Sequence, residues 1–197
     1  MRIVVVSAGM SVPSSTRILA DQLAGAAVGA LHGPVEVDVV ELRPLAHALA
    51  DHLLTGFPSG ELAEAVELVR HADAMIAVTP VFSASYSGLF KTFFDVLEPD
   101  LLSGMPVLIG ATAGTARHSL VLEHALRPLF TYLHATVVPT GVFAASEDFG
   151  EPGLEARVGR AAGELATLLM GAPRRRARSV EDGFDDPTPF EDLLRGA

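Results

Sequence analysis

Short apolar segments alternate with amphipathic segments along most of the chain, and this alternation restricts the fold more than any other feature. In the amphipathic segments, apolar residues such as Leu62, Val66 and Val69 recur at helical spacing. Strands are expected at residues 2–6, 35–40, 74–78, 106–111 and 136–142, and helices at 15–31, 61–71, 87–97, 118–133 and 154–170. Strict alternation predicts right-handed βαβ units, and therefore a parallel sheet with helices on both faces.

The predicted fold is an α/β three-layer sandwich around a five-stranded parallel sheet in the order 2-1-3-4-5. Ligands of such sheets bind beyond the carboxyl ends of the strands, at the switch point between strands 1 and 3. The 197 residues fit one domain, which we place at residues 1–171. Residues 172–197 carry a basic cluster, then acidic residues and few apolar ones, which predicts a flexible C-terminal extension or an arm on a neighbouring subunit.

Composition excludes several classes of protein. The net charge of −10 argues against nucleic acid as a partner, because phosphates require a basic surface. No run of about 18 uncharged apolar residues could span a membrane, and Met1-Arg2-Ile3 resembles the start of a strand rather than a signal peptide. Without cysteine there is no disulfide, thiol nucleophile or thiolate metal site, and His118 and His124 lack the i,i+4 spacing of a helical metal pair. We therefore expect a cytoplasmic enzyme without metal.

The turn after the first strand is rich in hydroxyl residues and leads directly into a helix. It contains Ser11, Ser14, Ser15 and Thr16, followed by Arg17. Unpaired backbone N–H groups and a partial positive charge at a helix N-terminus can hold a phosphate, which the hydroxyls and Arg17 would complete. The turn lacks both the Walker ending and the Gly-x-Gly-x-x-Gly fingerprint. A monophosphate site and a simple serine N-cap both fit these residues.

The turn after the third strand suits the edge of a planar cofactor. It contains a proline that stiffens it, an aromatic residue and small residues, in the order Pro80, Val81, Phe82, Ser83 and Ala84. Backbone amides in this turn could donate hydrogen bonds to the polar edge of an isoalloxazine ring, which points to flavin. An ordinary turn with a serine cap is the alternative.

The turn after the fourth strand consists of small residues that would let another molecule approach the backbone closely. Its residues are Thr112, Ala113, Gly114 and Thr115, with Arg117 and His118 following at the start of the next helix. A cation at a helix start opposes the helix dipole, so Arg117 is suited to face an anionic ligand, although a surface role also fits. The three turns follow strands 1, 3 and 4, which places them at one edge of the predicted sheet.

Over residues 2–170 the chain resembles the NAD(P)H-dependent FMN reductases, a family with a flavodoxin-like fold. The matching features are the serine-rich loop, the block Pro80-Val81-Phe82…Ser87-Gly88-Leu89-Phe90-Lys91…Asp95, and the turn at 112–115. The run at 113–120, with 126–130 behind it, is most similar to reductases partnered with luciferase-like monooxygenases. Phe82 stands where the family usually has tyrosine.

The resemblance implies that FMN is the cofactor and that NADPH or NADH donates hydride to flavin N5, with no catalytic side chain. It places cofactor contacts at Ser11, Ser14, Ser15, Thr16, Arg17, Pro80, Val81, Phe82, Ser83, Ala84, Thr112, Ala113, Gly114 and Thr115. It places the nicotinamide nucleotide beside Arg117 and His118. The protein would supply position and electrostatics. A homodimer or homotetramer, and delivery of reduced FMN to a flavin-dependent monooxygenase, are also implied.

Two other functions are compatible with the same fold. A flavodoxin-type electron carrier would hold FMN without a nucleotide site, and the acidity of the chain would suit a basic partner. Such carriers tend to enclose the flavin between Trp and Tyr, whereas this chain has no tryptophan, and its Tyr86 and Tyr132 lie at a helix start and within a helix. The other alternative is a reductase that keeps FMN bound and reduces a quinone or an azo compound.

Overall fold

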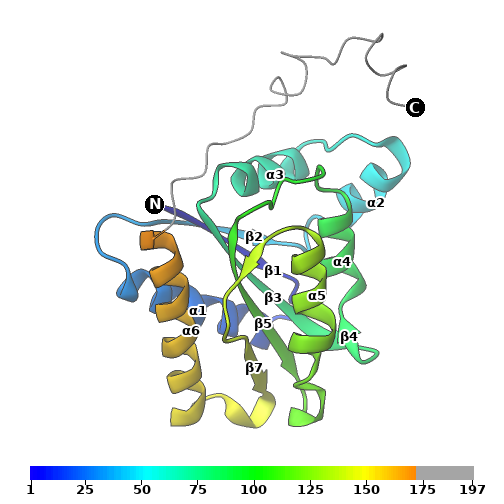
Figure 1. Cartoon of the computed structure of the whole chain (residues 1–197). Coiled ribbons are helices and arrows are strands. Elements are labelled where there is room, and N and C mark those ends of the chain that lie inside the picture. The colour runs from blue at the N-terminus through cyan, green and yellow to red at the C-terminus, as the bar shows by residue number, and fades with distance from the viewer. Residues whose placement is uncertain (172–197) are drawn as a thin grey trace, which may run out of the picture.

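A central sheet runs through the molecule between two layers of helices (Figure 1). This computed structural model describes residues 1–171, so the predicted extension at 172–197 lies outside the described residues. The strands are β1 (Arg2–Ser7), β2 (Glu36–Glu41), β3 (Ala74–Phe82), β4 (Ser85–Tyr86), β5 (Pro106–Ala113), β6 (Thr136–Val137) and β7 (Val142–Ala145). The helices are α1 (Ser15–Ala30), α2 (Ala46–Thr55), α3 (Glu61–His71), α4 (Gly88–Asp95), α5 (Arg127–Tyr132) and α6 (Pro152–Gly171), with the short helices η1 (Ala116–His118), η2 (Leu122–Leu126) and η3 (Ser146–Asp148).

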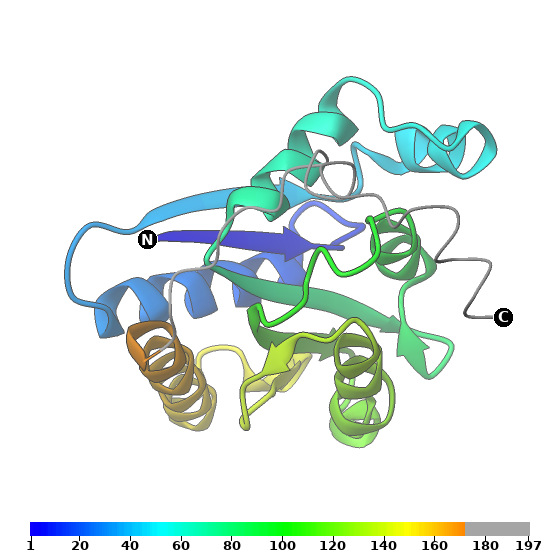
Figure 2. The same cartoon turned by 45° about the horizontal axis from the view of Figure 1, so that its top comes forward.

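The strand order along the sheet is β2-β1-β3-β5-β6, and β7 also pairs with β5. These pairings are parallel, and in Figure 2 the arrows of β1 and β3 point in the same direction. Because β5 is the fourth predicted strand and β6 with β7 replaces the fifth, the predicted order 2-1-3-4-5 is confirmed. The three-layer α/β sandwich is confirmed with it.

Each face of the sheet carries its own apolar cluster. Ile3 and Val5 of β1 pack under α1 and α6, whereas Val4 and Val6 pack under α2, α3, α4 and α5. Successive side chains of a strand point to opposite faces, so one strand serves both clusters. The phenylalanines of α4 belong to the second cluster and are all buried, namely Phe90, Phe93 and Phe94. These three aromatic side chains therefore belong to the core of the chain.

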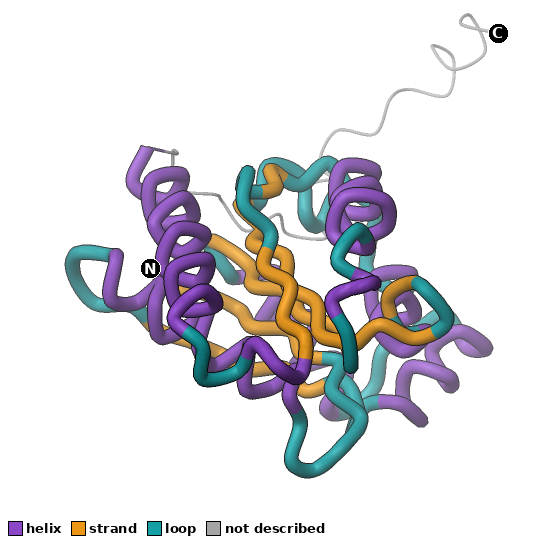
Figure 3. The backbone as a smooth tube through the Cα atoms, turned by 90° about the horizontal axis from the view of Figure 1, so that it is seen from below, coloured by secondary structure: helices purple, strands orange, loops and turns teal. Residues whose placement is uncertain are grey.

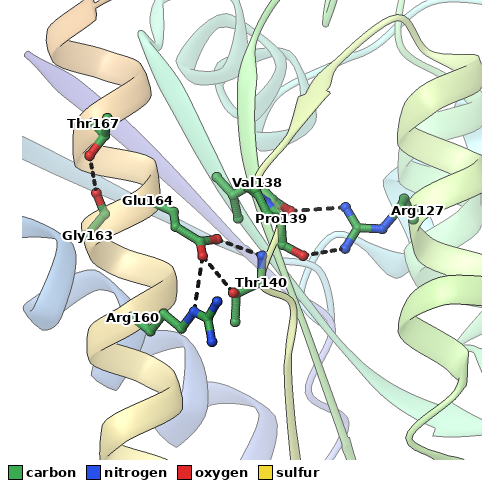
Figure 4. A network of polar contacts seen from close by, with 8 residues as sticks. All are labelled: Arg127, Val138, Pro139, Thr140, Arg160, Gly163, Glu164 and Thr167. Carbon is green, nitrogen blue, oxygen red and sulfur yellow. Dashed lines mark hydrogen bonds and ion pairs between the residues drawn. The ribbon is translucent and has the colours of Figure 1, made fainter.

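The prediction of one continuous strand at 136–142 is wrong, because the chain leaves the sheet after Val138 and forms two short strands, β6 and β7, instead. Pro139 has no backbone N–H to donate to a ladder. Figure 4 shows that this segment is held from both helical layers. On one side Arg127 donates to the carbonyl oxygens of Val138 and Pro139 at 3.0 and 2.9 Å. On the other side Glu164 accepts the backbone N–H and the hydroxyl of Thr140 at 2.6 and 2.7 Å.

Two further segments differ from the sequence prediction. The third strand does not end at Val78 but continues to Phe82 and turns back as β4. Together with the division of the fifth strand into β6 and β7, this gives the sheet with its hairpin seven strands rather than five. The predicted helix at 118–133 is divided into the 3-10 turn η1, the π-helical turn η2 and α5. Pro128 lies in the first turn of α5, where its missing N–H is tolerated, but it cannot continue an α-helix from η2.

Among the described helices, none combines the length and the apolarity that a bilayer crossing requires.

Replacing Glu164 by Gln should lower the free energy of unfolding at neutral pH by about 1–3 kcal/mol, because an amide cannot accept both Thr140 donors. Burial raises the pKa of Glu164, but the hydrogen bonds from Thr140 outweigh this, so its pKa lies below the usual 4.5. A lowered pKa stabilises the fold above about pH 4.5 and loses that contribution as pH falls through the folded value. Urea unfolding at pH 7 and pH 3.5 should therefore show a difference between wild type and variant that shrinks in acid.

The matched control is Arg160→Gln. Arg160 lies 3.4 Å from Glu164, but its side chain is 76% exposed, so its loss should cost less than about 0.5 kcal/mol. Equal effects of the two substitutions would show that the carboxylate does not hold the strand break.

Candidate functional site

The three turns selected from the sequence lie together at one end of the sheet. Figure 3 views the molecule from below, the side toward which β5 and β7 point in Figure 1, and loops project at this end between the helical layers. The backbone N–H of Ala8, after β1, donates to the Val78 carbonyl in β3 at 3.0 Å. Pro80 of β3 in turn lies opposite Thr112 of β5. The parallel pairing therefore brings the ends of β1, β3 and β5 side by side.

The loop after β1 presents hydroxyls at the start of α1. The hydroxyl of Ser14 accepts the backbone N–H of Arg17 at 3.2 Å and so caps the helix, while Ser11 and Ser15 are exposed. Gly9 lets the loop fold back on itself, because a Cβ there would lie 2.1 Å from the Ser14 hydroxyl. A 16-residue helix whose first turn is flanked by exposed hydroxyls offers the kind of donors that bind a phosphate monoester.

Thr16 and Thr112, both assigned to cofactor binding from the sequence, contact each other. Their hydroxyl oxygens lie 2.8 Å apart and both side chains are buried. This hydrogen bond joins the first turn of α1 to the end of β5, two segments 96 residues apart. Within the described structure, the two threonines thus fix the position of one loop relative to another.

Arg17, the cation expected near a phosphate, is engaged by carboxylates. Its Nε donates to Asp21 and its Nη1 to Glu41, both at 2.8 Å. The hydrogen bond to Asp21, supported by the one to Glu41, raises the pKa of Arg17. Its guanidinium consequently lies toward the end of β2.

The loop after β3 is a tight hairpin rather than an open βα turn. Val81 and Phe82 pair with Tyr86 and Ser85, which leaves Ser83 and Ala84 as the two turn residues. Both have positive φ, 50° and 66°, a conformation that favours glycine and that stores strain. The hairpin is exposed at its tip, from Phe82 to Ala84.

Thr79 fixes the base of this hairpin, a role that sequence reasoning missed. Its hydroxyl is fully buried, accepts the backbone N–H of Ser87 at 3.0 Å and donates to the Pro80 carbonyl at 2.9 Å. The signal was available, because a threonine between a buried strand and a proline needs a partner for its hydroxyl. Only the fold shows that this partner is the start of α4.

A pocket of about 370 Å³ lies between the hairpin and the segment η1–η2. Arg117 and His118, predicted beside the third turn, are exposed in η1 and line this pocket, and Gly114 and Thr115 are exposed just before them. The structure adds His124, which the sequence pattern did not select. The complete lining is Ala84, Ser85, Arg117, His118, Leu120, Val121, His124 and Ala125.

Among residues 1–171, no group of three or more His, Asp or Glu side chains is arranged to hold a metal ion. The site instead offers hydroxyls at the start of α1, the backbone of the hairpin after β3 and the guanidinium of Arg117, all at the carboxyl ends of the strands. This donor set can hold an anionic, planar cofactor and orient a second anionic ligand beside it.

Replacing Thr16 by Val should lower the free energy of unfolding by about 1–3 kcal/mol, because the buried Thr112 hydroxyl loses its partner. The double variant with Thr112→Val should be less destabilised than the sum of the two single variants, since no hydroxyl is then left unpaired. Urea unfolding of the four proteins measures this coupling. Additive effects would show that the two hydroxyls do not interact.

Comparison with known proteins agrees with this geometry. The family model described as NADPH-dependent FMN reductase matches residues 1–150. The NADH-dependent FMN reductase SfnE of Pseudomonas putida is 39% identical over 189 residues, which are 91% of this chain and 98% of the relative. An FMN reductase (NADPH) of Pseudomonas aeruginosa is 38% identical over 176 residues, covering 86% and 92% of the two chains.

A solved structure supports the same relationship. An oxidoreductase from Corynebacterium diphtheriae superposes with a TM-score of 0.84 at 48% identity, covering 87% of this chain and 98% of that chain. The match of the family model over most of the chain, together with these relatives, shows that the chain belongs to the NADPH-dependent FMN reductase family.

Proposed function

We propose that this chain catalyses hydride transfer from NADPH or NADH to FMN. The observation that carries the proposal is the convergence of three loops at one edge of the sheet, where a helix N-terminus, an exposed hairpin backbone and a cationic pocket adjoin. The helix N-terminus suits the FMN phosphate, the hairpin suits the isoalloxazine ring, and the cationic pocket suits the nicotinamide nucleotide.

The FMN phosphate would bind the first turn of α1. Ser11 and Ser15 are exposed there and can donate their hydroxyls, while the helix dipole favours the negative charge. Ser14 would act as the cap that shapes the loop, and Thr16 as its anchor to β5. Arg17 would have to exchange its bonds to Asp21 and Glu41 in order to contact the phosphate, because its guanidinium is engaged by these two carboxylates.

The isoalloxazine ring would lie between the hairpin at 80–84 and the turn at 112–115. Pro80 and the strained Ser83–Ala84 turn hold the hairpin amides in place, so their hydrogen bonds need little reorganisation. When bound, FMN supplies the redox chemistry, and the protein supplies binding and orientation. Small residues on the β5 side leave room for the ring.

Arg117 and His118 would orient the nicotinamide nucleotide beside the flavin. No side-chain acid or base is needed for hydride transfer, so the catalytic contribution is proximity, on the order of 7 kcal/mol or more for well-placed reactants. Delivery of reduced FMN to a monooxygenase, a cytoplasmic location and a homodimer or homotetramer remain predictions from the sequence resemblance.

An assay with purified protein separates this function from its alternatives. Oxidation of NADH or NADPH is followed by the loss of the absorbance of the reduced nicotinamide while FMN is varied. Saturation with free FMN as acceptor supports the proposal. Absence of turnover with bound FMN supports an electron carrier, and turnover that requires an added quinone or azo compound supports an FMN-bound reductase.

Replacing Gly9 by Ala should weaken FMN binding about tenfold, because the added Cβ would lie 2.1 Å from the Ser14 hydroxyl and displace the phosphate loop. Quenching of flavin fluorescence during titration measures the dissociation constant.

The control for this substitution is Gly25→Ala on the exposed side of α1, where an added Cβ has no heavy atom within 4 Å. Gly25→Ala should leave FMN affinity at the wild-type value. An unchanged affinity for Gly9→Ala would place the phosphate elsewhere.

A further inference from the structure

We propose that residues 174–178 of one copy of the chain dock on a second copy, in a groove between β2 and α3. This arginine segment reads Arg-Arg-Arg-Ala-Arg in the sequence and lies outside the described residues. The β2–α3 groove has a volume of about 460 Å³. The inference adds an interaction surface to the chain and does not depend on the proposed function.

The β2–α3 groove carries negative charge that its own arginine does not balance. Three glutamates line it, namely Glu41, Glu61 and Glu64, together with Arg17. Arg17 pairs with Glu41 at 2.8 Å, whereas the exposed Glu61 and Glu64 form no ion pair within residues 1–171. Both lie in the first turn of α3, where they favour the helix dipole and keep their carboxylates free for a cation. The groove therefore attracts a cationic partner.

The groove follows an unpaired edge of the sheet. Within the described residues β2 pairs only with β1, so the backbone groups of its outer edge have no strand partner. The consecutive residues Val39–Glu41 line the groove although side chains of a strand alternate between its faces, which places the groove along that edge. Such an edge accepts an extended segment as an additional strand. On the opposite wall, Leu68 of α3 offers apolar surface for the stem of an arginine.

The arginine segment has the spacing that this groove requires. In an extended chain every second side chain points to the same side, so Arg174, Arg176 and Arg178 would face α3 together, about 7 Å apart. Glu61 and Glu64 are three residues apart on α3, which places their Cβ atoms about 5–6 Å apart. Long side chains bridge this difference, and each guanidinium can bind a carboxylate through two hydrogen bonds.

The segment is too short to reach the groove of its own copy. α6 has 20 residues, which makes it about 30 Å long, and it begins after β7, at the carboxyl edge of the sheet. In Figure 2 β1 begins on the side where α6 ends and points away from it. The glutamates lie at the carboxyl edge, since Glu41 ends β2 and Glu61 opens α3. An extended chain spans at most about 10 Å from Gly171 to Arg174 and about 24 Å to Arg178, so the docking requires a second copy.

Spin labels test the docking, because the chain has no cysteine and introduced thiols are therefore unique. Ser179→Cys follows the arginine segment and defines the segment-labelled copy, and Ser59→Cys, in an exposed loop beside the groove, defines the groove-labelled copy. The two full-length variants are co-expressed with different affinity tags, and assemblies that contain both are isolated and labelled with a nitroxide. Double electron–electron resonance should show a narrow distance peak between the labels. At about 1 M salt, where the Debye length is about 3 Å, the peak should broaden.

Substitutions placed in one copy identify which groove is occupied. Glu61→Gln with Glu64→Gln in the groove-labelled copy should abolish the narrow peak, and the same pair in the segment-labelled copy should leave it unchanged. The matched control is Glu147→Gln with Glu151→Gln in the groove-labelled copy. It removes two exposed carboxylates outside the groove lining and should leave the peak unchanged.

Replacing the four arginines of the segment by glutamine changes no residue of the described body and should also abolish the peak. A peak that survives this replacement would overturn the proposal, as would a broad distribution between the unsubstituted labelled copies. The proposal also fails if no assembly with both copies is recovered, or if the peak responds to the Glu61 and Glu64 substitutions only in the segment-labelled copy.

Discussion

Parallel pairing of β1, β3 and β5 is the constraint on which the rest of the molecule depends. Because neighbouring strands run in the same direction, their carboxyl ends stop at one edge, and residues as distant as Thr16 and Thr112 come into contact there. The helices that return the chain must cover both faces, which divides the core into two clusters. The candidate site is therefore a consequence of the topology, and only its chemistry depends on the loop residues.

Buried polar side chains make these loops specific. Thr16 and Thr112 satisfy each other's buried hydroxyls, the buried hydroxyl of Thr79 accepts the backbone N–H of Ser87, and the half-buried carboxylate of Glu164 accepts the backbone N–H of Thr140. An unmade hydrogen bond in a buried position costs more than a made one contributes, so each contact selects one loop conformation over its alternatives. A site that binds by position rather than by covalent chemistry requires this kind of fixation.

The distribution of charge completes the site. Across the described part of the chain, carboxylates pair with most of the arginines near the site, including Arg17 and Arg127, and Arg117 lies in a pocket lining that no carboxylate joins. Under the proposed function, a cationic pocket in a chain with a net charge of −10 would direct an anionic nucleotide toward one place. The sequence resemblance selected Arg117 and His118. Only the tertiary structure shows that Arg17 is paired with Asp21 and Glu41 and that His124 lines the same pocket as Arg117.

The sequence by itself determined the layers, the strand order and the edge that carries the loops, because hydrophobic periodicity and βα alternation are local properties read through general packing rules. It did not determine the division of the last strand at 138–141, the hairpin at Ser83–Ala84 or the break of the helix at 118–133. Those features depend on partners distant in the chain, such as Arg127 and Glu164 at the strand break. Local propensity carries no information about such partners, so the tertiary structure decided them.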